Sequence, residues 1–249
     1  NVTEEDILRA TQDAFSAGWS GVKLYFMIGL PTETDEDVLG IADLARKIAA
    51  QFYQLPKEKR GKGLRMTVSV STFVPKPFSA FQWCGQVPAE EIRRRQELLR
   101  NAMRGVRGAE LHCHFSELSV LEAAFSRGDE KLADVLLRAY ELGCRFDAWT
   151  EHFKKDAWAQ AFKDCGLSAE DYAERTFEKD EPMPWDFVDM LVTKEYLYSE
   201  FTRARNGETT PDCREGCNGC FGARCEADCR SLPKNAAESG TGSRAGSAL

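Results

Sequence analysis

The residues most suited to chemistry are five cysteines near the C-terminal end of the chain. Their spacing is C-x3-C-x2-C-x4-C-x3-C, and they are Cys213, Cys217, Cys220, Cys225 and Cys229. Short loops with glycines let several thiolates converge on one centre, and four thiolates suit zinc or an iron–sulfur cluster. Disulfide pairing in an exported protein is the alternative. Because no secretory leader is visible and the thiols are clustered, we favour a metal site in a reducing, cytoplasmic compartment.

A second set of candidates lies on stretches predicted as strands. Apolar and polar residues alternate over Val22 to Ile28, Leu64 to Val74 and Glu110 to Phe115, which is typical of strands. If the apolar sides meet helices, the other sides carry Lys23, Tyr25 and Met27; Arg65, Thr67, Ser69 and Ser71; and Glu110, His112 and His114. Parallel strands are usually apolar on both faces, so this pattern suggests a wet or ligand-lined interior. A register error, or polar groups that satisfy one another, are the alternatives.

Two histidines on the third predicted strand share a face, because His112 and His114 are two residues apart. They could bind a metal or move protons. No third ligand is evident nearby, so two hydrogen-bonded histidines are the favoured interpretation. The remaining cysteines are predicted as ordinary buried thiols: Cys84, Cys113, Cys144 and Cys165.

The segment from Ile28 to Thr34 predicts a ligand edge. Gly29 comes at the C-terminal end of the first strand, where a glycine lets a ligand approach the backbone. The loop then leads into a helix N-terminus, whose free N–H groups face the same edge. A plain strand-to-helix turn stiffened by Pro31 is an equally good interpretation.

The elements that must position these residues alternate along the first 115 residues, in the order helix, strand, helix, strand, helix, strand. Thr3 and either Thr32 or Thr34 are predicted to cap the first two helices, and Pro88 to open the third. Helices between strands imply parallel crossovers, and therefore an α/β layer or a barrel segment. Three strands are too few for a closed eight-stranded barrel.

The rest of the chain is predicted to be mainly helical. Helices are expected over Glu117 to Ser126, Glu130 to Leu142, Asp156 to Cys165 and Thr193 to Arg205. The predicted domains are a barrel segment at 1–115, a helical extension at 116–207, a cysteine-rich metal-binding segment at 208–230 and a disordered tail at 231–249. The tail should be dispensable, because it has almost nothing to bury.

Composition limits the classes of function. The 249 residues are 43% hydrophobic and 29% charged, enough for an ordinary soluble core, and no apolar run is long enough for a membrane span. The net charge of -7 argues against nucleic-acid binding by bulk charge. Arginines near the cysteines and on one helix keep an RNA- or protein-binding zinc ribbon as the alternative function; they are Arg214, Arg224 and Arg230, and Arg93, Arg94, Arg95 and Arg100.

Several segments together resemble the C-terminal half of a radical S-adenosylmethionine (SAM) enzyme. The resemblance rests on Lys23-Leu-Tyr-Phe-Met-Ile-Gly-Leu-Pro-Thr-Glu-Thr34 and on Val68 to Phe78, with its Val-Pro-Lys-Pro. It is closest to an uncharacterised, cobalamin-binding-type branch of that superfamily and covers residues 1 to about 230. Similar segments follow the barrel in that branch; here they are Leu121 to Asp129, Phe146 to Trp149 with Glu151 to Phe153, and Thr210 to Cys213.

The resemblance implies the C-terminal part of a partial, six-stranded (β/α)6 TIM-like barrel. Gly29 and Leu30 would lie at the edge of the fifth strand, near the adenine of SAM, and Val68 to Phe73 would form the sixth. Together with the inward-facing strand residues, this gives Gly29, Leu30, Tyr25, Ser69 and Ser71 as expected cofactor-binding residues. The superfamily's fifth-strand pattern, G-x-I-x-G-x-x-E, is not fully kept: Tyr25 replaces its first glycine, and Glu33 comes one residue late.

The first three clustered cysteines have the spacing of those that bind the superfamily's catalytic 4Fe–4S cluster. In the superfamily those cysteines follow the first barrel strand, whereas here they come after the barrel-like elements. Because the chain begins with Asn1 rather than Met, we expect the catalytic cluster, and any cobalamin domain, to lie upstream. The C-terminal cysteines would then bind an auxiliary iron–sulfur cluster or a zinc. The chain is thus predicted to be a fragment of a cytoplasmic radical SAM enzyme, inactive alone, with SAM as its small-molecule partner.

Overall fold

The computed structural model describes residues 2–61, 63–214 and 216–222. It divides into two compact units: Asn1–Pro77 with Gln82–Pro184, and Phe78–Phe81 with Trp185–Leu249. Two of the clustered cysteines, Cys225 and Cys229, and the predicted tail at 231–249 lie outside the described residues. Within the described residues, no helix is both long and apolar enough to cross a membrane.

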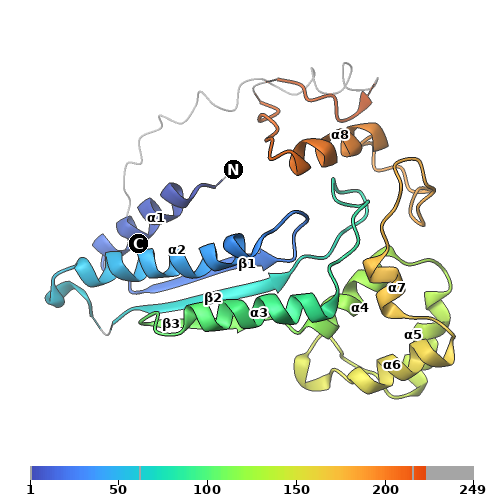
Figure 1. The fold of residues 1–249 in the computed structure, drawn as a ribbon, viewed down its shortest axis with the longest axis horizontal. Coiled ribbons are helices and arrows are strands. Elements are labelled where there is room, and N and C mark those ends of the chain that lie inside the picture. The colour runs from blue at the N-terminus through green and yellow to red at the C-terminus, as the bar shows by residue number, and fades with distance from the viewer. Residues whose placement is uncertain (1, 62, 215, 223–249) are drawn as a thin grey trace, which may run out of the picture. The chain divides into compact units, whose positions relative to one another are not determined.

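The larger unit contains an open parallel sheet and most of the helices (Figure 1). The strands, in the sheet order β1-β2-β3, are β1 (Gly21–Ile28), β2 (Arg65–Thr72) and β3 (Ala109–Cys113). Its α-helices are α1 (Glu4–Ser16), α2 (Asp35–Gln54), α3 (Ala89–Met103), α4 (Ser116–Arg127), α5 (Leu132–Glu141), α6 (Lys155–Asp164) and α7 (Ala169–Glu174). Two short 3-10 helices are η1 (Lys57–Lys59) and η2 (Thr150–His152). The smaller unit contains α8 (Lys194–Arg205).

The predicted α/β alternation and the parallel pairing of the strands are confirmed. β2 pairs in parallel with both β1 and β3, so that Ser69 lies between Tyr25 and His112 across the sheet. Thr67 likewise lies between Lys23 and Glu110. The described strands form an open sheet rather than a closed barrel. The helix α7 was not predicted from the sequence.

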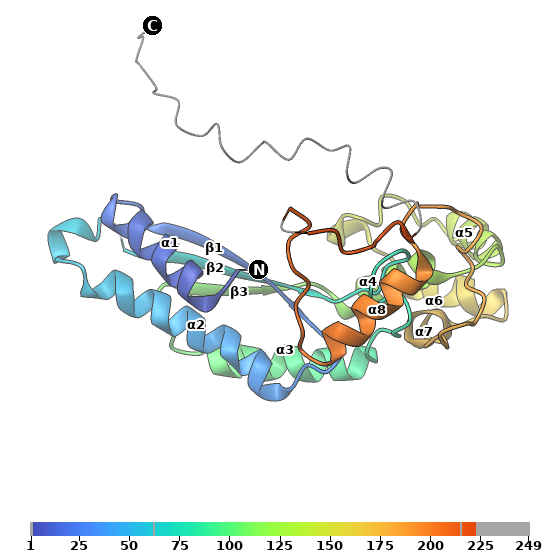
Figure 2. The ribbon, with the colours of Figure 1, turned by 90° about the horizontal axis from the view of Figure 1, so that it is seen from above.

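The two faces of the sheet differ sharply. One face packs against helices; α2 and α3 run along it in Figure 2, and Val68 and Val70 are fully buried beneath them. The opposite face carries the polar residues, and there Tyr25 is 71% and Met27 51% exposed. Burial of apolar surface therefore holds the sheet from one side and leaves the polar side open.

Local hydrogen bonds fix the start of α2. Thr34 is the N-cap: its hydroxyl oxygen accepts a hydrogen bond from the Asp37 N–H at 3.3 Å. The Asp37 carboxylate in turn accepts a hydrogen bond from the Thr34 N–H at 2.8 Å, which completes a capping box. Of the two threonines predicted as caps, Thr34 rather than Thr32 has this role. This cap fixes where the loop after β1 ends.

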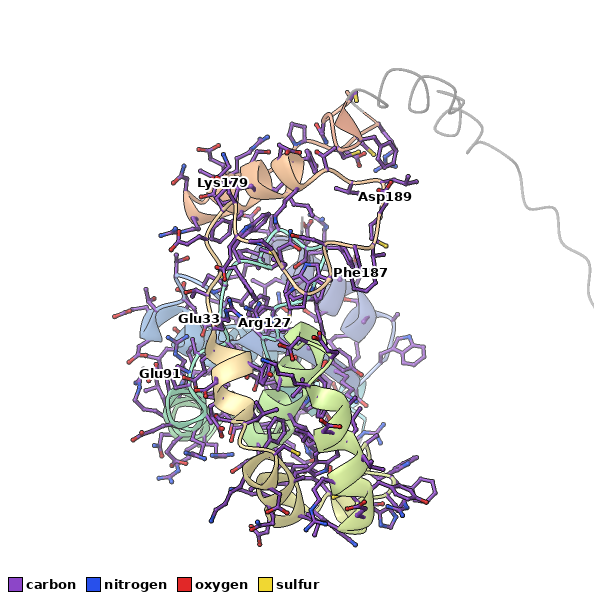
Figure 3. The ribbon with its side chains drawn as sticks, turned by 90° about the vertical axis from the view of Figure 1, so that its right-hand side faces the viewer. Glu33, Glu91, Arg127, Lys179, Phe187 and Asp189 are labelled. Carbon is purple, nitrogen blue, oxygen red and sulfur yellow. The ribbon has the colours of Figure 1, made fainter. Side chains whose placement is uncertain are left out.

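A buried arginine joins the helical part of the larger unit to the loop after β2. Arg127, labelled in Figure 3, ends α4 and is 1% exposed. Its guanidinium donates hydrogen bonds to the backbone carbonyls of Gln82, at 3.1 Å, and Arg175. Burial lowers the pKa of Arg127 to about 10, so this side chain remains charged at neutral pH.

Candidate functional site

The carboxyl ends of β1 and β2 meet at one edge of the sheet. Ile28 lies opposite Thr72, and the Phe73 N–H donates to the Ile28 carbonyl at 2.8 Å. Gly29 follows with φ +86°, and a Cβ there would come within 3.0 Å of Val87 Cγ2. The positive φ favours glycine at this position, and a Cβ would also press on the Val87 side chain. Ligands of open parallel sheets bind outside the carboxyl ends of the strands, so this is the candidate edge.

The loop after Gly29 contains a strained turn. The Glu33 N–H donates to the Leu30 carbonyl at 3.2 Å, and Pro31 and Thr32 form the middle of the turn. Thr32 has φ 68°, a left-handed conformation that a β-branched residue rarely adopts. Such conformations cost about 1–3 kcal/mol and occur most often at ligand-binding and active sites.

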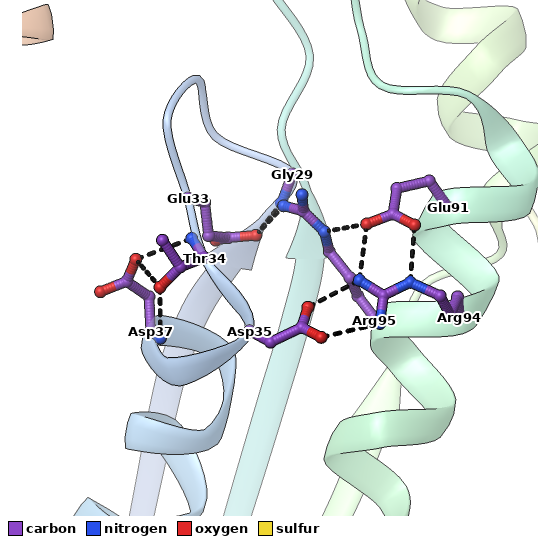
Figure 4. A network of polar contacts seen from close by, with 8 residues as sticks. All are labelled: Gly29, Glu33, Thr34, Asp35, Asp37, Glu91, Arg94 and Arg95. Carbon is purple, nitrogen blue, oxygen red and sulfur yellow. Dashed lines mark hydrogen bonds and ion pairs between the residues drawn. The ribbon is translucent and has the colours of Figure 1, made fainter.

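Glu33 holds this loop in place (Figure 4). Its Oε2 accepts a hydrogen bond from the Gly29 N–H at 2.7 Å and lies 2.5 Å from Arg95 Nη1 on α3. The side chains of Glu33 and Arg95 are 7% and 12% exposed. Glu33, which lies one residue later than the glutamate of the superfamily pattern, therefore closes the loop on itself and anchors it to α3.

An ion-pair network surrounds this contact. Glu91 pairs with both Arg94 and Arg95 at 2.7 Å, and Arg94 also makes two bonds to Asp35, at 2.6 and 2.9 Å. Hydrogen bonds from Arg94 and then Arg95 hold the pKa of Glu91 at about 2. Hydrogen bonding to Arg94 likewise lowers the pKa of Asp35. Glu91 and Asp35 are therefore charged at neutral pH. Together with their arginine partners they tie the start of α2 to α3.

The five predicted cofactor-binding residues lie on or beside the open face. Tyr25 and Ser69 are partners across β1 and β2, and Ser71 is the partner of Met27. The Ser71 hydroxyl donates to the Phe26 carbonyl at 3.3 Å. Leu30 is half-buried, while Gly29 is buried and its N–H is already used. The proposed cofactor-binding role of these residues stays a prediction.

The histidines of β3 are near the same face. His112 is exposed, and its Nε2 lies 3.3 Å from Glu110 Oε1. His114 follows the strand, is also exposed, and donates its backbone N–H to the Val70 carbonyl at 3.0 Å. Among the described residues, no group of three or more His, Cys, Asp or Glu side chains is arranged to hold a metal ion. The histidines thus have no third ligand within that part of the chain.

The cysteine loop belongs to the smaller unit. Cys213 and Cys217 are exposed and Cys220 is half-buried. The Gly219 N–H donates to Cys217 Sγ at 3.4 Å, and the Cys220 carbonyl accepts from the Thr193 N–H at 2.9 Å. The first bond stabilises negative charge on the sulfur, and the second fixes the loop to the N-cap of α8.

Tyr196 is a half-buried residue near the start of α8. Burial is the main cause that raises the pKa of its hydroxyl, followed by the charge of Glu200.

The basic helix predicted as an alternative RNA-binding face is largely neutralised. Each of its four arginines pairs with a carboxylate: Arg93 with Glu117, Arg94 with Asp35, Arg95 with Glu33, and Arg100 with Glu97. Arg214, near the cysteines, pairs with Asp212. Paired guanidinium groups attract phosphate less strongly than unpaired ones, so these ion pairs argue against α3 as a nucleic-acid-binding surface.

The structural roles of Arg95 and Arg127 were not identified from the sequence. The spacing of Glu91 and Arg95 on one helix indicates an ion pair. Nothing in the sequence, however, connects Arg95 to Glu33, which lies 62 residues earlier. Arg127 could not be distinguished from a surface arginine at a helix end, because its buried partners are backbone carbonyls.

Comparison with known proteins gives a distant relative. The chain is 29% identical over 140 residues to the uncharacterized protein MJ0966 of Methanocaldococcus jannaschii. The match covers 55% of this chain and 28% of that protein, so the chain spans less than a third of the length of the curated relative it matches. No known protein family matches the sequence, and no solved structure matches it.

Proposed function

We propose that this chain is part of a radical SAM enzyme and that its open sheet face forms part of the SAM-binding wall. The observation that carries the proposal is a parallel sheet covered by helices on one face, whose other face is polar and ends at the Gly29–Glu33 loop. When bound, SAM would supply radical chemistry: one electron from a 4Fe–4S cluster would cleave it to methionine and a 5′-deoxyadenosyl radical able to abstract a hydrogen atom from a substrate. The cluster ligands would come from a segment upstream, and the sheet would be the end of a partial six-stranded barrel.

The residues of the open face suit a polar, partly planar ligand. Tyr25 presents an exposed ring and hydroxyl, and Ser69 lies beside it on the next strand. The Ser71 hydroxyl already donates a hydrogen bond to the Phe26 carbonyl. Gly29 would set the course of the backbone at this edge of the sheet, because it is buried and its N–H donates a hydrogen bond to Glu33. Leu30 would offer an apolar contact to the ligand.

Removing two hydroxyls from the open face should test this role. In the full-length protein, Tyr25→Phe with Ser69→Ala should weaken SAM binding, and lower 5′-deoxyadenosine formation, by about tenfold, because each lost hydrogen bond costs about 0.5–1.5 kcal/mol. Tyr140→Phe is the matched control, since Tyr140 is similarly exposed but lies on α5. Equal SAM affinity in all three proteins would contradict the proposal.

The clustered cysteines would bind an auxiliary iron–sulfur cluster or a structural zinc. The ligands would be Cys213, Cys217 and Cys220, with Cys225 or Cys229 as the fourth. The hydrogen bond from the Gly219 N–H to Cys217 Sγ supports this assignment, because such hydrogen bonds stabilise a metal-bound thiolate. The anchoring of Cys220 to Thr193 means that a metal here would also stabilise the start of α8.

Metal analysis of variants should identify this centre. Anaerobically purified protein with Cys217→Ala and Cys220→Ala should lose either iron and sulfide equal to one cluster, or one zinc. Cys165→Ala, which removes an isolated half-buried thiol, should keep the full content. Loss of iron and sulfide would identify a cluster, and loss of zinc a structural site. Unchanged metal content in the double variant would refute the assignment.

A further inference from the structure

A cavity of about 800 Å³ lies beside the carboxyl end of β3, inside the larger unit. This volume is within the roughly 300–1,000 Å³ typical of small-molecule sites. The wall is formed by the end of β3, by α4, by the segment around residues 147–150 and by Trp158 of α6. A second cavity, of about 330 Å³, opens between α4 and α6.

One side of the large cavity is aromatic. Phe115, Phe125 and Trp158 line it, and the rings of Phe125 and Trp158 meet edge to face with centroids 5.6 Å apart. Trp158 Nε1 is buried without a hydrogen-bond partner within the described residues. Aromatic faces attract both apolar groups and cations. This wall therefore suits a ligand with an apolar body.

The charged groups of the cavity are acidic. Its lining includes Glu122 and Asp147, together with His114, but neither lysine nor arginine. Glu122 is balanced by Lys76, whose Nζ lies 2.6 Å from Oε1 and also donates to Ser126 at 2.9 Å. Asp147 accepts a backbone N–H from Lys154 at 3.4 Å, while the Lys154 ammonium is directed to the Gly143 carbonyl at 2.7 Å. Within the described chain, Asp147 thus makes no ion pair.

We propose that this cavity binds a small organic cation: an amine with an aromatic or alkyl body. The ammonium group would pair with Asp147, and the body would lie against Phe115, Phe125 and Trp158. A charge-assisted bond to a carboxylate combined with cation–π contact favours an amine over an acid of the same shape. That the cavity holds the substrate of the enzyme rests on the proposed function; the binding of amines does not.

Three probes that share one aromatic body would test the charge selectivity. Phenethylamine, phenethyl alcohol and hydrocinnamate differ mainly in their charge, and their dissociation constants can be measured on the full-length protein by ligand-observed NMR. Phenethylamine should bind at least about tenfold more tightly than hydrocinnamate, given the strength of bonds to charged groups. Similar affinities for all three probes would overturn the proposal, as would the absence of saturable amine binding.

Two variants would locate the binding. Asp147→Asn keeps the acceptor for Lys154 but removes the charge, and should weaken phenethylamine binding by about tenfold. Asp13→Asn, an exposed carboxylate on α1, is the matched control and should change nothing. Ala148→Trp should fill the cavity and abolish binding of every probe. Equal effects of the two asparagine variants, or full binding by Ala148→Trp, would place the amine elsewhere and refute the site.

The amine assay requires neither SAM nor a metal cluster. If amines bind at Asp147 and the Tyr25 variant retains normal SAM chemistry, the proposed function fails while the cavity assignment stands. If SAM binding depends on the open face but amines do not bind, the cavity assignment fails alone. Failure of the amine site can therefore be distinguished from failure of the SAM-binding wall.

Discussion

At the scale of single residues, the contact between Glu33 and Arg95 differs from the other ion pairs of the larger unit. Both side chains are nearly buried, and Glu33 also accepts the Gly29 N–H. A buried charge that loses its partner is costly, whereas an exposed ion pair contributes little. Arg95 therefore contributes to the shape of the loop at Gly29 as well as to stability.

We expect Arg95→Met to lower the free energy of unfolding by about 3 kcal/mol, because Glu33 would be left as an uncompensated buried charge. Arg100→Met removes a half-exposed arginine from the same helix and should cost less than about 1 kcal/mol. Urea unfolding monitored by circular dichroism would measure both. Losses of the same size would mean that the buried pair has no special role.

The residues of the loop show how far sequence reasoning reaches. The capping pattern is local, so a cap by either Thr32 or Thr34 was predicted; the structure shows that Thr34 has this role. The left-handed Thr32 and the partner of Glu33 were not predicted. A threonine gives no signal for a positive φ, and the ion pair depends on how α3 packs, which no local pattern reveals.

At the scale of elements, the alternation of apolar and polar residues identified the strands of the sheet. The predicted strands at 22–28, 64–74 and 110–115 correspond to β1, β2 and β3 with small shifts at their ends. The pattern succeeded because one face is buried by helices and the other is open, so apolar and polar residues separate cleanly. Helix α7 was missed because its six residues are too few to show a helical period.

The helical elements beside β3 show the opposite case. Helices α4, α5 and α6 were predicted to within a few residues, but the cavity that they form with residues 147–150 was not. Its aromatic and acidic residues are spread over Phe115 to Trp158 and become neighbours through packing of the helices. A sequence pattern can therefore predict the helices but not the site between them.

At the scale of the whole molecule, acidic residues outnumber basic ones, 40 to 33, and stability should depend on pH through carboxylates in ion pairs. Glu91 joins Arg94 and Arg95, while Glu117 contacts Lys155 at 2.8 Å and Arg93 at 3.4 Å. Hydrogen bonds from Arg94 and Arg95 lower the pKa of Glu91 from 4.5 to about 2. The Lys155 hydrogen bond has the same effect on Glu117, whose pKa is also about 2.

The lowered pKa values of Glu91 and Glu117 determine how the stability of the protein changes with pH, and over which pH range. A carboxylate with a lower pKa in the folded state than in the unfolded state stabilises the protein above the unfolded value. The stabilising contribution of Glu91 and Glu117 should be complete above about pH 5 and should fall as the pH approaches 2. Each contribution should be about 1 kcal/mol or less, because both carboxylates are partly exposed.

We therefore expect the double variant Glu91→Gln with Glu117→Gln to have a lower Tm than the parent at pH 7, and the difference to shrink toward pH 3. A loss of 1 kcal/mol corresponds to about 2–4 °C for a protein of this size. Glu130→Gln, an exposed glutamate without an ion pair in the described chain, should follow the parent at every pH. Thermal unfolding from pH 3 to pH 7 would measure all three proteins. A difference that stays constant over this range would show that Glu91 and Glu117 stabilise the helices by packing and not by charge.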